Sequence, residues 1–278
     1  MKNSRSSVFR KFLPGSTASA LFILLLLLVS AGSLQAEPTQ AAIAAYNAYA
    51  HTVESRLAQQ HRGQSGFLAP LSAREQSEVR LRKGELIVEQ LTPATGSDFP
   101  GAMLHHWRGT AFAPGAKAGD CERLMRDFNR YPQIYSPQVL QAKVISQSGD
   151  QMQSTMRVRQ QHVLTVVLDT AYDITFGRLD AQHGFSSSIS TRIAEIDHAG
   201  TRGERALSAN EEHGYLWRQN TYWSYEERDG GLYLQVESIS LTRSIPTGLG
   251  WAIRPFVESV PRESLEFTLR SICNALHR

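Results

Sequence analysis

The alternation of apolar and polar residues predicts helices at the start of the chain and a long series of strands after them. Between Ala41 and Leu57, apolar residues recur every three or four positions, the period of a helix with one buried face. A more charged helix is expected over 72–82. From residue 85 onward the pattern indicates strands, at 85–91, 104–112, 138–146, 152–169, 172–179, 185–196, 215–228 and 232–243.

Turn residues mark where several of these strands end. Asp229 and Gly230 lie between two long runs rich in aromatic and β-branched residues, which is a strong hairpin signal. A two-residue turn there pairs Arg228 with Gly231. The pairing decides which side chains of the two strands share a face.

Two further helices interrupt or follow the strands. Asp120 is expected to cap a short helix that stops before Pro132. After the last strand, Ser259 and Pro261 are placed to begin the main part of a long helix. Its buried stripe is formed by Leu265, Leu269, Ile272 and Leu276. The expected class is α+β, with a curved antiparallel sheet wrapped around this C-terminal helix.

The first 36 residues have the layout of a secretory signal peptide. Four basic residues precede an unbroken apolar run at 21–29, and small residues follow. Cleavage is expected after Ser33 or Ala36, with an uncleaved anchor as the alternative. We therefore expect a signal peptide at 1–36, a helical extension at 37–84 and a main domain at 85–278. The mature chain has no second apolar run of spanning length, so a periplasmic or secreted protein is predicted.

The net charge of the chain argues against one class of partner, nucleic acids. The whole chain has 29 Lys and Arg against 26 Asp and Glu. Without the first 36 residues, the counts become 25 and 26. A nearly neutral mature chain lacks the basic excess typical of nucleic-acid binding, so no nucleic-acid partner is expected.

The familiar catalytic and cofactor motifs are absent from the sequence. It contains no G-x-S-x-G elbow, no phosphate-binding loop and no H-E-x-x-H helix. His105 and His106 are adjacent on a strand, so they point to opposite faces and cannot bind one metal together. All the histidines are interpreted as surface or interface residues. Neither a metal nor a cofactor is predicted.

Three stretches carry a resemblance to a known superfamily: residues 107–115, residues 127–135 and the tail from 237 through 265. Together with the element order, they resemble the helix-grip fold of the START-like, or SRPBCC, superfamily of polyketide cyclases/dehydrases and lipid-transport proteins. The tail is similar to that of exported bacterial members. The resemblance implies a hydrophobic ligand in a cavity between the sheet and the C-terminal helix. It transfers no catalytic residue, and the helices before residue 85 lie outside the usual fold.

The last hairpin and the start of the last helix supply the candidate ligand-binding residues: Tyr222, Trp223, Tyr225, Glu237, Arg243, Trp251 and Phe256. With Arg228 opposite Gly231, Trp223 and Tyr225 share one face, whereas Tyr222, Glu237 and Arg243 share the other. Both faces mix aromatic and polar residues, so either can line a cavity. For the aromatic residues the alternative is core packing. For Glu237 and Arg243 it is a solvated charge ladder with Arg218.

Three functions remain open at this point. The first is an exported protein that holds a lipid or another hydrophobic or amphipathic small molecule. The second is an enzyme of the cyclase or hydrolase type that uses a cavity Glu or Tyr as acid or base. The third is a subunit of an envelope complex that docks through the helix between Ala41 and Leu57. An apolar stripe exposed on that helix would support the third function.

The two cysteines, Cys121 and Cys273, form a possible disulfide. In an oxidising compartment two such residues can pair. In the helix-grip arrangement that the resemblance implies, the short helices support the end of the long one, where Cys273 lies. The alternative is two small buried thiols that never meet.

Overall fold

The computed structural model describes residues 37–72, 74–93, 99–161, 165–245 and 250–277, with the backbone alone over 250–258. The predicted signal peptide lies outside these residues. The helical elements are α2 (Gln40–Gln60), α3 (Arg74–Arg82), α4 (Ala118–Arg126), η2 (Phe128–Arg130), α5 (Tyr131–Ile134) and α6 (Gly250–Leu276). The strands are β1 (Ile87–Gln90), β2 (Ala102–Pro114), β3 (Val139–Ser148), β4 (Gln151–Gln161), β5 (Thr165–Arg178), β6 (His183–Asp197), β7 (Arg205–Ala206), β8 (Arg218–Arg228) and β9 (Gly231–Arg243).

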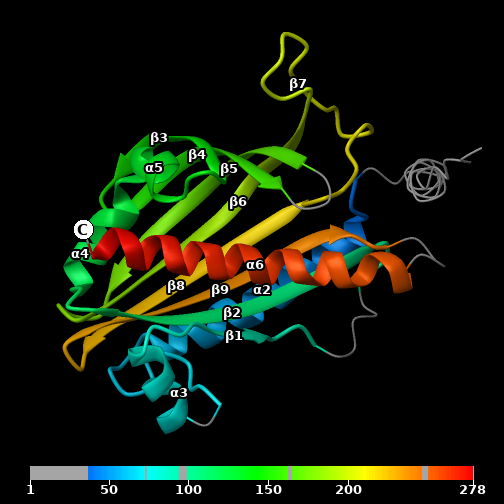
Figure 1. The fold of residues 1–278 in the computed structure, drawn as a ribbon. Coiled ribbons are helices and arrows are strands. Elements are labelled where there is room, and N and C mark those ends of the chain that lie inside the picture. The colour runs from blue at the N-terminus through cyan, green and yellow to red at the C-terminus, as the bar shows by residue number, and fades with distance from the viewer. Residues whose placement is uncertain (1–36, 73, 94–98, 162–164, 246–249, 278) are drawn as a thin grey trace, which may run out of the picture. The chain divides into compact units, whose positions relative to one another are not determined.

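The strands form one antiparallel sheet in the order β1-β2-β9-β8-β6-β5-β4-β3, with the short β7 paired to β6. Figure 1 shows α6 crossing one side of this sheet and α2 lying behind it on the other. We call these two surfaces the α6 face and the α2 face. This is the expected α+β helix-grip arrangement, with an additional helical layer on the back of the sheet.

The core on the α6 face is built by the stripe that the sequence predicts. Leu265, Leu269 and Ile272 are buried against aromatic and aliphatic side chains of the strands. The helix comes closest at β2, because Gly109 has no side chain there. A Cβ atom at that position would lie 2.6 Å from Cδ1 of Leu269.

The α2 face has its own apolar core. The buried residues of α2 recur at helical spacing and pack on Leu104, Ile239 and Leu241 of the sheet. The α2 residues involved are Ala42, Tyr46, Ala50, Val53 and Leu57. The stripe proposed for docking to an envelope partner is therefore covered by the protein's own sheet. The exposed stripe that would have supported the third function is not found on this helix.

The β8–β9 hairpin has the predicted turn and register. Arg228 is paired with Gly231. Asp229 and Gly230 have φ angles of 56° and 75°, as a two-residue turn of the I′ type requires. Trp223 and Tyr225 therefore point to the α6 face, and Tyr222 and Glu237 to the α2 face.

Several predicted boundaries are wrong. Asp120 does not cap the first short helix but lies in the first turn of α4, whose N-cap is Lys117. The expected strand 152–169 is divided, because β4 ends at Gln161 and β5 begins at Thr165. The next strand was expected at 172–179, but β5 already begins at Thr165 and includes Thr170 and Ala171. Pro261 does not begin the main part of the last helix but lies well inside α6. Among the described helices, none combines the length and the apolar character needed to cross a membrane.

Candidate functional site

The α6 face of the sheet changes in character along its length. Near the C-terminal end of α6 it is apolar and closely packed, with Trp223, Tyr225 and Leu234 in the core. Toward the other end the same face carries Ser188 opposite Thr221, and Gln219 opposite Ser240. Ser188, Thr221 and Gln219 are only partly buried. The face thus combines an apolar floor with a belt of small polar side chains.

Several buried polar atoms on this face have no hydrogen-bond partner among the described residues. Trp107 Nε1, Ser154 Oγ, Gln160 Oε1 and Tyr225 OH form no hydrogen bond within the described part of the chain. By strand alternation all four belong to positions that point toward α6. A buried group without a partner costs free energy, and such groups are frequent where a ligand or ordered water completes the bonding.

The predicted ligand residues are divided between the two faces. Trp223 and Tyr225 lie on the α6 face, where burial raises the pKa of Tyr225. Tyr222, Glu237 and Arg243 share the opposite face. Trp251 and Phe256 belong to α6, but their side chains lie outside the described residues. The structure therefore does not gather the seven residues into one site.

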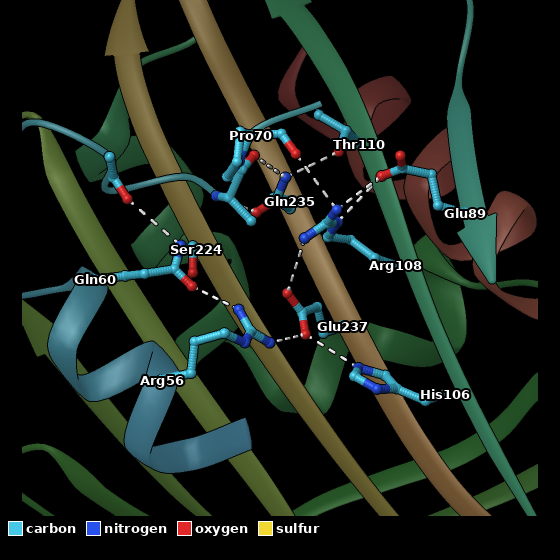
Figure 2. Close-up of polar contacts among 12 residues, drawn as sticks. Arg56, Gln60, Pro70, Glu89, His106, Arg108, Thr110, Ser224, Gln235 and Glu237 are labelled. Atoms are coloured by element: carbon cyan, nitrogen blue, oxygen red, sulfur yellow. Dashed lines mark hydrogen bonds and ion pairs between the residues drawn. The ribbon is translucent and has the colours of Figure 1, made fainter. Parts of the chain in front are cut away.

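Glu237 is the centre of a charged cluster that the sequence did not predict. Its side chain is only 2% exposed, so the interpretation as part of a solvated charge ladder is wrong. Oε2 accepts hydrogen bonds from Arg56 on α2 at 2.5 Å and from His106 on β2 at 3.1 Å. Oε1 lies 3.7 Å from Arg108 Nη1. Figure 2 shows Glu237 between the two guanidinium groups, with His106 beside it.

Burial alone would raise the pKa of Glu237, but its bonded neighbours outweigh burial. The His106 hydrogen bond and the Arg56 guanidinium bring the pKa of this carboxyl below its usual value. Tyr49 Oη lies 2.8 Å from the other ring nitrogen of His106. Arg108 is held in turn by Glu89 at 3.0 Å. The cluster therefore ties α2, β1, β2 and β9 together.

This cluster borders a groove of about 600 Å³ between α2, β2 and the loop at 66–70. Polar side chains of Tyr49, Arg56, Gln60 and Arg108 line it beside the apolar Val53, Leu91 and Pro70. Strand parity places His106 and Arg108 on the same side as Glu237. The contribution of Arg56 could not be foreseen, because helix periodicity does not say which strands α2 covers.

The buried histidines are a further correction. His105 and His106 are each 3% exposed, and His183 is 6% exposed, so these three are core residues. Burial lowers the pKa of His105 to about 4, and Nε2 of its ring lies 2.9 Å from Thr242 Oγ1. The described residues contain no group of three or more His, Cys, Asp or Glu side chains placed to hold a metal ion.

Cys121 and Cys273 lie in the same core cluster, the first buried and the second partly buried. Both are free thiols in the structure. Burial raises the pKa of Cys121, and the charge of Cys273 adds to this shift. The disulfide remains a prediction. Thiol counting on denatured, unreduced protein tests it, and two free thiols would exclude the bridge.

No family model and no curated protein matches the sequence. Solved structures are similar in fold. A STAR-related lipid transfer protein from Xanthomonas axonopodis is 16% identical, with a TM-score of 0.43 over 69% of this chain and 99% of its own. The Zhui aromatase/cyclase of Streptomyces sp. R1128 is 11% identical, with a TM-score of 0.42 over 63% and 94%. Human STARD10 is 9% identical, with a TM-score of 0.41 over 76% and 82%. The strand order and the position of α6 give this chain a START-like helix-grip fold.

Proposed function

We propose that the α6 face binds a hydrophobic or amphipathic small molecule between the sheet and α6. The observation that carries the proposal is a set of buried polar atoms that form no hydrogen bond within the described part of the chain: Trp107 Nε1, Ser154 Oγ, Gln160 Oε1 and Tyr225 OH. Trp107 and Tyr225 belong to the apolar core of this face, and polar atoms set among apolar side chains are typical of a ligand pocket. An apolar ligand with one or two polar atoms would be held by burial and oriented by these groups.

The position of the partly buried residues supports the same proposal. Ser188 and Thr221 lie in the interior strands β6 and β8, opposite each other on the side that faces α6. Interior strands covered by a helix normally carry well-packed apolar side chains. Ser188 and Thr221 are instead small and partly buried, beside the apolar Trp223 and Ile174. A lipid chain or a compact ring system would suit such a surface.

A bulky residue at Ser188 tests the proposal. The probe is stearate carrying a nitrobenzoxadiazole fluorophore, whose emission rises on entering an apolar site. Ser188→Trp should weaken binding roughly tenfold or more, because the indole occupies the proposed site. The matched control is Thr175→Trp. Thr175 lies on the neighbouring strand β5, and its side chain is exposed on the opposite face of the sheet from Ser188. Equal binding by both variants and the wild type would contradict the proposal, as would no binding by any of them.

Catalysis is less well supported than binding. An acid or base on the α6 face would need an available carboxylate near Tyr225. Glu122 is close enough to Tyr225 to act on it electrostatically, but its carboxylate is ion-paired with Arg126 and Arg178. The buried carboxylate of Glu195 accepts hydrogen bonds from the backbone of Gly214 and Tyr215 and contacts His213. Its contacts are those of a loop anchor, and Glu237 lies on the opposite face. No arrangement on the described α6 face favours the cyclase or hydrolase alternative.

Export is a separate part of the proposal. It rests on the basic start, the apolar run at 21–29 and the small residues before position 37. N-terminal sequencing of protein recovered from outside the cytoplasm should begin after Ser33 or Ala36. An intact N-terminus on membrane-bound protein would show an anchor instead.

A further inference from the structure

Three polar side chains on the α2 face form a continuous hydrogen-bonded chain that begins at the wall of the groove. Tyr49 on α2 and His106 on β2 both line this groove, which has a volume of about 600 Å³. Tyr49 Oη lies 2.8 Å from His106 Nδ1, and His106 Nε2 lies 3.1 Å from Glu237 Oε2. A hydroxyl, an imidazole and a carboxylate are therefore connected in series.

The positions of the protons in this chain follow from its carboxylate end. The His106 hydrogen bond and the Arg56 guanidinium keep the pKa of Glu237 below its usual value, so Glu237 is an ionised acceptor. In its neutral form His106 then carries its proton on Nε2, and the Nδ1 lone pair accepts a hydrogen bond from Tyr49. Tyr49 is thus bonded to a base that a carboxylate orients, which is the arrangement that activates hydroxyl nucleophiles.

The Tyr49 hydroxyl needs a base in order to react. Burial and the nearby Glu237 carboxylate raise the pKa of Tyr49, so the hydroxyl is protonated at neutral pH. It becomes a good nucleophile when its proton moves to His106 Nδ1 during the attack. The negative Glu237 then balances the positive charge that the imidazole gains. The three side chains therefore supply a nucleophile, a base and a group that stabilises the charged base.

The walls of the groove indicate which electrophile suits this nucleophile. Among the described residues that line it there is no Asp or Glu. Apolar wall is provided by Val53, Pro70 and Leu91. Arg108 is already ion-paired with Glu89 and Glu237, whereas Nε of Arg56 has no hydrogen bond within the described part of the chain. One available guanidinium beside apolar surface suits the single negative charge of a tetrahedral acyl intermediate better than the multiple charge of a phosphoryl group.

Arg56 is placed on the same side of α2 as Tyr49. It follows Tyr49 by seven residues, which is two helical turns, and the side chains of a helix lean toward its N-terminus. Its Nη2 shares Glu237 Oε2 with His106. The side chain is 39% exposed, so a molecule from solvent can reach it.

We propose that Tyr49 is the nucleophile of a second site, which hydrolyses small esters of apolar carboxylic acids. Tyr49 Oη attacks the carbonyl carbon while its proton moves to His106 Nδ1. The ester C–O bond then breaks, and the leaving alkoxide takes that proton. Water attacks the acyl-tyrosine and gives a proton to His106, which returns it to the Tyr49 oxygen as the carboxylic acid leaves. The inference uses no residue of the α6 face, so it is independent of the proposed ligand site.

Phenylmethanesulfonyl fluoride tests the nucleophile, because its reaction with a hydroxyl releases fluoride and leaves a stable sulfonyl ester. Peptide mass spectrometry of the purified protein should find Tyr49 labelled about tenfold faster than Tyr215, or more. Tyr215 is the internal control. It is 41% exposed and its ring stacks on that of His213, but the described structure shows no hydrogen bond between the two side chains. Equal or slower labelling of Tyr49 would overturn the proposal.

Hydrolysis of p-nitrophenyl butyrate, followed by the release of p-nitrophenol, tests the reaction. Tyr49→Phe keeps the ring and removes the hydroxyl, so the rate should fall about a hundredfold. Tyr215→Phe is the matched control and should keep the wild-type rate. An unchanged rate in Tyr49→Phe would contradict the assigned nucleophile. Cleavage of p-nitrophenyl phosphate in place of the butyrate would contradict the assigned substrate class.

A third variant separates the chemical role of His106 from a structural one. His106→Gly should lose the activity and regain part of it when imidazole is added, because free imidazole can take the proton of Tyr49. Folded His106→Gly that hydrolyses the ester at the wild-type rate, or that imidazole does not restore, would overturn the role of the base. If this variant does not fold, the two phenylalanine variants decide the proposal without it.

Discussion

Gly109 shows how a single residue sets the distance between the sheet and its covering helix. Leu265 and Leu269 of α6 fill the space above this glycine. Any larger residue would push the helix outward or force these leucines from their rotamers. The sequence stretch around Gly109 contributed to the family resemblance, but its packing role depends on a contact with residues far along the chain. Local sequence could not predict that contact.

Gly109→Ala should destabilise the protein by about 1–3 kcal/mol, because its Cβ would overlap Leu269. Chemical denaturation followed by circular dichroism measures the loss. Gly119→Ala is the matched control. The nearest atom to a Cβ there is 3.8 Å away, so we expect no loss of stability. Equal stability of the two variants would show that α6 does not pack on Gly109.

Acid should weaken the fold before the carboxylates titrate. Burial lowers the pKa of His105 and of His61 to about 4, against an ordinary value of 6.5. Between these values the unfolded chain binds protons that the folded chain does not, so the free energy of unfolding falls as pH drops from 6.5 toward 4. His105→Gln should reduce this slope by roughly half, because His61 still titrates. An unchanged slope would mean that His105 is not buried as described.

At the scale of elements, a strand boundary is predicted correctly from the sequence where turn-forming residues mark it. Asp229 and Gly230 specify their turn, and the register of β8 and β9 follows from it. The division between β4 and β5 carries no glycine or proline, so the pattern there indicated one long strand. At Pro261 a local signal is present but misleading. Proline is typical of a helix start, whereas here it lies inside α6.

Leu269 tests the packing of α6 as an element. Its side chain is fully buried, so Leu269→Asp should place a charge in the core and remove cooperative thermal unfolding. Arg270→Asp, at the next and exposed position, should change the stability by no more than about 0.5 kcal/mol. Wild-type melting of Leu269→Asp would contradict the placement of the helix.

At the scale of the whole molecule, the sheet separates two surfaces with different chemistry. The hairpin register correctly assigned the predicted site residues of β8 and β9 to alternating faces, and these faces belong to two different surfaces of the protein. Which face α6 covers and which α2 covers depends on tertiary contacts. Glu237 illustrates this limit, because its partner Arg56 is 181 residues away in the chain.

The helix α2 should be required for folding, since it covers Ile239 and Leu241 at the centre of the sheet. Deletion of residues 37–60 together with the predicted signal peptide is expected to give aggregated protein without a cooperative melting transition. Deletion of residues 1–36 alone should give soluble protein with a single transition. A stable, monomeric product of the longer deletion would show that α2 is a detachable element and would reopen the docking function.

Native mass spectrometry of the purified mature protein tests ligand binding on the α6 face most directly. The predicted result is a discrete mass above that of the polypeptide, which disappears on denaturation and is recovered by organic extraction as a lipid or another apolar molecule. Ser188→Trp should lack this added mass, and Thr175→Trp should retain it. A bare polypeptide mass for the wild type, together with no binding of the fluorescent stearate, would contradict the proposed function.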